Sequence, residues 1–267
     1  MDRMMLAGAL LAAMALLALS LGFADGGAGR VETAQAAPPP ASFAPTPPPW
    51  AVLASVATSA TKPPKPQPDP DTTIFTVRPG ASVELRDAPG GKVVETVGDT
   101  TEFGSPTVLT AIERRGAWAG VPTQLLPNGE LAWIRAGDPG LKADTVGQSI
   151  VIDLSEMRGE LSRNGEVERR WKVGIGGSGT PTPTGRFSIT DEIESGLNPV
   201  YGCCAIALSA TQPNLPPGWT GGDRIAIHGT SEPLGEANST GCVHSSDADL
   251  HALIEGVPLG TPVTIRR

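Results

Sequence analysis

The chain has 267 residues, enough for about two domains of ordinary size. Its formal net charge is −8 at pH 7, which argues against binding to nucleic acid, because such proteins usually present a basic face. Aromatic residues make up only 4% of the chain, whereas Pro (27) is abundant and much of it lies in one stretch.

The N-terminus has the pattern of an export segment. Arg3 precedes an uncharged apolar run over residues 6–23, long for a signal-peptide core and about the minimum for a membrane-spanning helix. Small residues such as Ala34 and Ala36 suit a signal peptidase. We expect residues 1–36 to be a cleaved signal peptide or a retained membrane anchor, and both place the rest of the protein outside the membrane. A buried core helix is the remaining alternative.

Residues 37–73 form a Pro-rich linker with three proline runs. Such a segment is extended and does not pack a core. We expect it to hold the following domains at a distance from the membrane.

Residues 74–140 are typical of a small all-β unit. Val83 and Leu85 alternate with polar residues, and Asn128-Gly129 is a hairpin turn ahead of the apolar stretch 131–134. Short strands at this spacing predict a small barrel or sandwich.

Residues 141–267 predict a second, mostly antiparallel β unit with one or two helices. Asn164-Gly165 is a further hairpin turn. Near the end, Ser246 with Asp249 three residues on predicts a capped helix, which continues with apolar residues at helical spacing over 250–257.

Three cysteines are present, and an odd number leaves at least one thiol free. Cys203 and Cys204 are adjacent, and a bridge between neighbours is strained because their Cα atoms are about 3.8 Å apart. We therefore expect two small apolar residues in a buried strand.

Cys242 and His228 are the residue types of nucleophilic catalysis. A free thiol titrates near 8.5, so it needs a neighbouring base to ionise at neutral pH. His228 ends an apolar strand and heads a glycine-containing turn. Taken alone, these two residues are better explained as a structural thiol and an ordinary hydrogen-bonded histidine.

Two longer patterns change this balance. The segment His228-Gly229-Thr230 followed by Ser239-Thr240-Gly241-Cys242-Val243 resembles the signature of the L,D-transpeptidase catalytic domain, the YkuD-type domain. Residues 182–187 and 258–263 resemble further motifs of that family. The resemblance implies that 141–267 is a β-sandwich-like catalytic domain with its motif loops around a cleft.

The first β unit carries a weaker resemblance. Residues 74–140, with Leu85-Arg86, Trp118 and Trp133, resemble bacterial SH3-like domains. This implies a small N-terminal SH3-like β-barrel that binds cell wall or peptide, and a plain spacer domain is the alternative.

The family resemblance implies a mechanism. Cys242 attacks the third-residue carbonyl of a peptidoglycan tetrapeptide stem, D-alanine leaves, and an amine resolves the thioester into a 3→3 cross-link. His228 acts as base and acid, oriented by the Gly229 carbonyl. Backbone N–H groups of Gly241 and Thr240, with that of Cys242, hold the oxyanion. Carbapenems are expected to acylate Cys242, and no cofactor or metal is implied.

The resemblance places Tyr201, Thr230 and His244 on the substrate side of the cleft. Two residues depart from the family pattern: Thr240 stands where a histidine is usual, and His244 where an arginine is usual. A titratable imidazole ring thus replaces a permanently charged guanidinium group. The alternative is that His244 is a surface residue without a role. Packing is the alternative for Tyr201, and His251 is expected to be structural.

Three alternatives stay open. Water in place of the amine gives an L,D-carboxypeptidase. The two departures from the family pattern are also compatible with a catalytically silent wall-binding protein. A metal hydrolase would use the metal-ligand types His228, Cys242, His244 and Asp247.

Overall fold

The computed structural model describes residues 72–267, so our expectations for the export segment and most of the linker lie outside it. Within this range no helix is long and apolar enough to cross a membrane. The described residues build two hydrophobic cores. We name residues 72–146 the N-terminal β unit and residues 147–267 the C-terminal unit.

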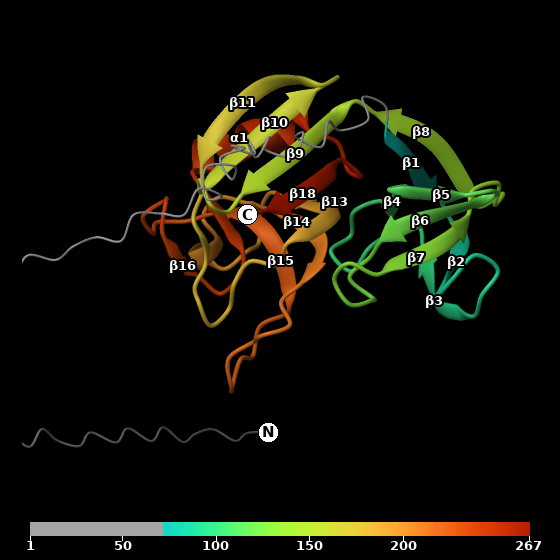
Figure 1. The fold of residues 1–267 in the computed structure, drawn as a ribbon, viewed down its shortest axis with the longest axis horizontal. Coiled ribbons are helices and arrows are strands. Elements are labelled where there is room, and N and C mark those ends of the chain that lie inside the picture. Colours follow the sequence, from blue (N-terminus) through green and yellow to red (C-terminus); the bar gives the residue numbers. More distant parts are fainter. Residues whose placement is uncertain (1–71) are drawn as a thin grey trace, which may run out of the picture. The chain divides into compact units, whose positions relative to one another are not determined.

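Eight strands form the N-terminal β unit, in antiparallel sheets of order β3-β2-β7-β6-β5 and β4-β1-β8 (Figure 1). Their bounds are β1 (Thr72–Val77), β2 (Ser82–Arg86), β3 (Val93–Gly98), β4 (Val108–Thr110), β5 (Glu113–Arg115), β6 (Trp118–Pro122), β7 (Leu131–Arg135) and β8 (Leu141–Val146). Val83 and Leu85 are buried, as the alternation predicts. Asn128-Gly129 lies in the connection of the β6–β7 hairpin. The expected all-β character is confirmed, and the SH3-like assignment stays a prediction.

The boundary between the units lies later than we expected. Strand β8, which we had placed in the catalytic domain from residue 141 on, pairs with β1 from Thr72↔Val146 to Val77↔Leu141. Leu141 is buried in the core of the N-terminal β unit. Strand pairing therefore moves the boundary to residue 147.

The C-terminal unit contains an eight-stranded sheet of order β11-β10-β9-β18-β13-β14-β15-β17 and a two-stranded sheet of β12 and β16. The bounds are β9 (Gln148–Asp153), β10 (Arg158–Arg163), β11 (Glu166–Lys172), β12 (Ile175–Gly176), β13 (Gly185–Ile193), β14 (Ala205–Thr211), β15 (Arg224–Gly229), β16 (Ala237–Ser239), β17 (Val243–Ser245) and β18 (Pro262–Arg266). Asn164 (φ 49°) and Gly165 (φ 83°) make the β10–β11 turn, because these two residue types tolerate a left-handed backbone.

Strand β13 joins the two halves of the large sheet. Its first part pairs with β18 over Gly185–Ser188, and its second part pairs with β14 over Ile189–Ile193. Side chains from both halves, such as Ile152 and Ile227, share one core. The sheet thus folds back over its own apolar face, which is the sandwich-like arrangement that we expected.

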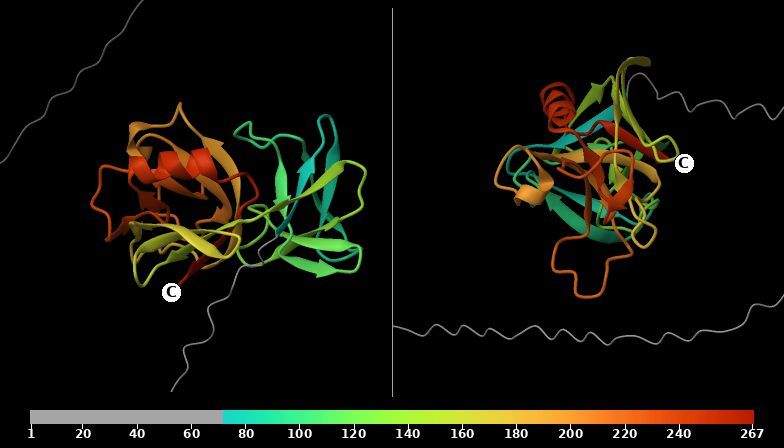
Figure 2. Two further views of the ribbon diagram at one scale, coloured as in Figure 1. Left: turned by 90° about the horizontal axis from the view of Figure 1, so that it is seen from above. Right: turned by 90° about the vertical axis from the view of Figure 1, so that its left-hand side faces the viewer.

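The described residues contain one α-helix, α1 (Asp247–Gly256), and a short 3₁₀ turn, η2 (Pro199–Tyr201). The Ser246 hydroxyl accepts a hydrogen bond from the Asp249 N–H (3.1 Å), as the predicted cap requires. Leu250 and Leu253 are fully buried, and α1 packs against β15 (Figure 2). The helix therefore fixes the strand that carries His228.

Candidate active site

Two adjoining parallel strands bring the candidate residues together. Strand β15 pairs with β17 in the register Ile227↔Val243, His228↔His244. Ile227 points into the core, so by strand alternation His228 points to the other face. Cys242 directly precedes β17, and its sulfur lies 3.8 Å from the Arg224 carbonyl of β15. Strand pairing thus brings the two motifs side by side, and Cys242 lies fourteen residues after His228 in the chain.

The His228 ring is held in one tautomer. Its Nδ1 lies 2.7 Å from the Gly229 carbonyl, which only accepts, so Nδ1 carries the proton and Nε2 keeps a lone pair. The ring meets those of Tyr201 (4.9 Å between centroids) and His244 (4.8 Å) edge to face. Burial lowers the pKa of His228 to about 4, with a smaller contribution from His244 in the same direction. His228 is therefore a neutral base at neutral pH.

Cys242 is a free thiol, half-buried. Burial raises its pKa, and the Ala226 backbone partly opposes this effect. Its sulfur donates to the Arg224 carbonyl at 3.8 Å, and within residues 72–267 no hydrogen bond joins it to the His228 ring. In this state the thiol is protonated and turned toward the Arg224 carbonyl of β15, so formation of a thiolate needs a base and a change in the direction of the sulfur.

The cysteine loop, residues 239–242, is closed by its own side chains. The Ser239 hydroxyl donates to the Cys242 carbonyl (2.6 Å) and accepts from the Gly241 N–H (3.1 Å). Gly241 has φ 112°, a conformation that side chains rarely adopt. The Thr240 carbonyl accepts from Gln212 at 3.2 Å. Our sequence analysis did not single out Gln212, because its contact with this loop depends on tertiary packing.

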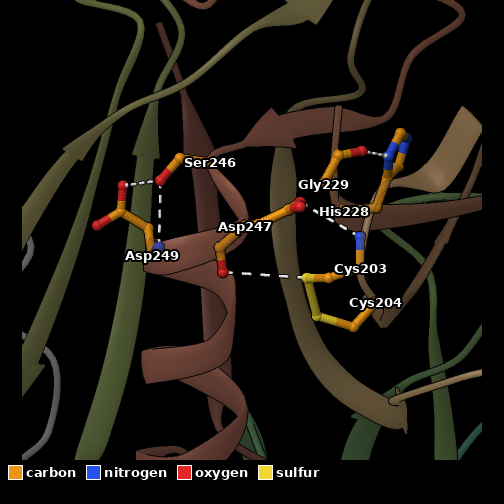
Figure 3. Close-up of a disulfide and its surroundings, with 7 residues drawn as sticks. All are labelled: Cys203, Cys204, His228, Gly229, Ser246, Asp247 and Asp249. Carbon is orange, nitrogen blue, oxygen red and sulfur yellow. Dashed lines mark hydrogen bonds between the residues drawn. A yellow bond between two sulfur atoms is a disulfide. The ribbon is translucent and has the colours of Figure 1, made fainter. Parts of the chain in front are cut away.

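Helix α1 reaches the turn after His228 through Asp247. Its Oδ1 accepts from the Cys203 N–H at 3.2 Å (Figure 3). A Cβ on Gly229 would lie only 2.1 Å from this oxygen and 3.0 Å from the Cys203 nitrogen. Gly229 is therefore packed so tightly that only a glycine fits beside Asp247, and its carbonyl is held in place for the His228 ring.

The expectation for Cys203 and Cys204 was wrong. The two residues precede β14 and are joined in a disulfide, with Cys203 half-buried and Cys204 buried (Figure 3). His251, which is exposed on α1, brings a ring nitrogen within 4.8 Å of both sulfurs. Among the described residues, Cys203, Cys204 and His251 are the metal-ligand residue types that cluster. They are not the four residues that we had considered for a metal hydrolase.

The three candidate substrate residues lie in different surroundings. Tyr201 is half-buried in η2 against the His228 ring. The Thr230 hydroxyl accepts from the Glu232 N–H at 3.0 Å and so stabilises its own turn. His244 is only 8% exposed, and its buried Nδ1 has no hydrogen-bond partner. The alternative of a surface histidine is therefore wrong. Burial lowers the pKa of His244 as well.

The fold and these side chains define a class: a sandwich-like β domain that carries one free thiol and two buried imidazoles on adjoining parallel strands. Comparison with known proteins identifies the family. The model of the L,D-transpeptidase catalytic domain, YkuD, matches residues 147–265, which is nearly the whole C-terminal unit.

Two Bacillus proteins named YkuD and assigned by name to the L,D-transpeptidases are similar to this chain. The B. subtilis (strain 168) protein is 31% identical over 132 residues, 48% of this chain and 73% of its own length. The B. licheniformis protein is 28% identical over 130 residues, 48% of this chain and 71% of its own length. The chain belongs to the L,D-transpeptidase family, which implies a peptidoglycan acyltransferase.

An L,D-transpeptidase from Mycobacterium tuberculosis H37Rv is 18% identical, with 51% of this chain and 64% of that chain covered and a TM-score of 0.39.

Proposed function

We propose that the protein is a peptidoglycan L,D-transpeptidase in which Cys242 is the nucleophile and His228 the general base and acid. The observation that carries the proposal is the His228 ring, which is neutral and fixed through Nδ1 on Gly229, and whose strand β15 also contacts the Cys242 sulfur through the Arg224 carbonyl. The pKa of His228 lies well below that of the buried thiol, so we propose that the proton passes to the ring only as the sulfur bonds to the substrate carbonyl.

The reaction proceeds in two balanced steps. His228 Nε2 takes the proton of Cys242 as the sulfur bonds to the third-residue carbonyl of a tetrapeptide stem. The imidazolium returns this proton to the D-alanine amine as the C–N bond breaks. An acceptor amine then attacks the thioester, gives its proton to His228, and forms a 3→3 cross-link, while the thiol is regenerated.

The developing oxyanion needs N–H donors near the sulfur. We propose the backbone N–H groups of Thr240, Gly241 and Cys242. The Gly241 N–H is engaged by Ser239, so it contributes only when that bond opens. Tyr201, Thr230 and His244 are the proposed substrate contacts. The unpartnered Nδ1 of His244 supports a polar contact there, and a neutral histidine forms one without a charge.

The test uses the full chain and a purified tetrapeptide muropeptide, with products read by mass spectrometry. The proposal predicts a cross-linked dimer and released D-alanine, both absent with Cys242→Ala. A trimmed tripeptide without dimer instead supports the L,D-carboxypeptidase, which uses the same site with water as acceptor. If a well-folded chain forms no product, both the transpeptidase and the carboxypeptidase activities are rejected.

Export to the cell wall and wall or peptide binding by an SH3-like N-terminal β unit are part of the same proposal. Their support is the apolar N-terminal segment, the Pro-rich linker and the all-β fold of residues 72–146. A carbapenem separates the enzyme from a silent wall-binding protein. The enzyme gains one drug equivalent in intact mass, and Cys242→Ala gains none; a wild-type chain that stays unmodified supports the silent protein.

A further inference from the structure

The side-chain amide of Gln212 is placed against the cysteine loop. Gln212 follows β14 directly and is only 4% exposed. Its Nε2 lies 3.2 Å from each of three carbonyl oxygens, those of Thr180, Pro181 and Thr240. Its Oε1 accepts from the Asn214 N–H at 3.0 Å. A buried amide with partners on both of its polar atoms has one orientation.

The peptide bond between Thr240 and Gly241 is held from both sides. Gln212 binds its carbonyl, and the Ser239 hydroxyl accepts from its N–H at 3.1 Å. A trans peptide is planar, with its C=O and N–H pointing in opposite directions. Rotation of this peptide would therefore break both hydrogen bonds together, and Cys242 is the next residue in the chain.

The contact between Gln212 and the loop leaves no room for a side chain at Gly241. A Cβ there would lie 2.0 Å from Gln212 Nε2 and 3.2 Å from a methyl group of Ile225. Gln212 also ties the loop to a second segment, because Thr180 and Pro181 belong to the connection between β12 and β13. The Thr180 hydroxyl in turn donates to the Ser239 carbonyl at 3.3 Å. The amide thus sits where two loops meet beside the thiol.

We propose that Gln212 is a positioning residue for Cys242: it locks the Thr240–Gly241 peptide and so fixes the direction in which the sulfur and the N–H of Cys242 point. The proposal rests on the proposed function in taking Cys242 as the nucleophile. Gln212 touches neither substrate nor reacting atoms. It acts through the backbone of the cysteine loop, which is why only a variant of the amide group itself reveals its role.

Two variants of Gln212 separate the effect of its hydrogen-bond donors from the effect of its side-chain volume. Gln212→Met keeps the approximate length of the side chain and removes the donors. Gln212→Glu removes the donors only while the carboxyl is ionised. Burial raises the pKa of such a carboxyl, and once protonated it regains one O–H donor for a carbonyl. Gln124→Glu, at a half-buried glutamine of the N-terminal β unit, is the matched control.

In the transpeptidation assay, kcat of Gln212→Met is expected to fall roughly 10- to 100-fold with KM changed less than about threefold, because a misplaced nucleophile slows chemistry more than binding. Gln212→Glu is expected to lose as much at pH 8 and to recover at least about threefold, relative to the wild type, by pH 5.5. A wild-type kcat in a folded Gln212→Met, or a Gln212→Glu profile parallel to that of the control, overturns the proposal.

A second arm needs no substrate. Iodoacetamide labelling of the peptide that contains Cys242 reports the environment of the thiol directly. We expect its rate to change at least about threefold in Gln212→Met, with no change in the control. If the wild type makes no cross-links, the proposed function fails but this arm still tests Gln212. Should Gln212→Met not fold, the labelling rate of Gln212→Glu at pH 8 and pH 5.5 decides: a ratio equal to that of the wild type rejects the lock.

Discussion

His228 and His244 face each other across two parallel strands, with ring centroids 4.8 Å apart and an interplanar angle of 62°. Both rings are buried, and burial lowers both pKa values. Two imidazolium ions at this distance repel each other, so the pair takes up protons in coupled steps. The pair is thus neutral at the pH where a general base has to accept a proton.

The pH profile of kcat/KM should reflect this pair. With the pKa of His228 at about 4, activity should fall only as pH drops toward 4, well below the ordinary histidine value of 6.5. In His244→Phe the repulsion is gone, so the pKa of His228 rises and the acid limb moves to higher pH. Steady-state rates from pH 3.5 to 8 check this. An acid limb of the wild type near 6.5 contradicts it.

The free energy of unfolding should depend on pH through the protonation of His228. The pKa of His228 is lower in the folded state than in the unfolded state, so the unfolded state binds this proton more tightly. The folded state is therefore fully stable with respect to His228 above pH 6.5, and it loses this stability as the pH falls toward 4. The difference amounts to about 3 kcal/mol in the free energy of unfolding. Urea unfolding at several pH values should give a flatter pH dependence for His228→Gln than for the wild type. Equal slopes would mean that the ring takes up its proton without cost in the fold.

Gly229→Ala should disturb the turn that orients His228. Its Cβ would lie 2.1 Å from the Asp247 carboxylate, so we expect a loss of roughly 1–3 kcal/mol in unfolding free energy and a lower kcat. The double variant Gly229→Ala/Asp247→Ala removes the clashing oxygen and should recover part of the stability lost. Thermal unfolding of the single and double variants checks this. Additive losses would show that Asp247 is not what excludes a side chain there.

The bond between Cys203 and Cys204 should be dispensable for the chemistry. It closes the smallest possible loop, so it constrains the unfolded chain little. The intact mass should rise by two hydrogens on reduction, and Cys203→Ser/Cys204→Ser should keep transpeptidation within about threefold of the wild type. Loss of activity in this variant, with Cys242 intact, would indicate that Cys203 or Cys204 is the nucleophile.

Features governed by neighbouring residues could be predicted from the sequence. The Asn164-Gly165 turn and the Ser246 cap depend on a few adjacent residues, and both are present as expected. The mainly-β character of both units followed from alternation and turn residues. The boundary at residue 141 was placed too early because the partner of β8 is β1, more than sixty residues away.

The candidate site depended more on long-range pairing. Resemblance singled out Cys242 and His228, and strand pairing brings their segments together. The burial of His244 and the amide of Gln212 depend on contacts between distant segments, which have no local pattern. The vicinal disulfide was missed because the expected strain between neighbouring residues argued against it.

The most direct test of the central claim is to trap the acyl-enzyme. The full chain is mixed with tetrapeptide muropeptide, quenched in acid within seconds and digested, and the peptides are mapped by mass spectrometry. We expect a stem that has lost its terminal D-alanine, attached as a thioester to Cys242 and absent in Cys242→Ala. An adduct on Cys203 or Cys204, or cross-linked product formed by Cys242→Ala, would contradict it.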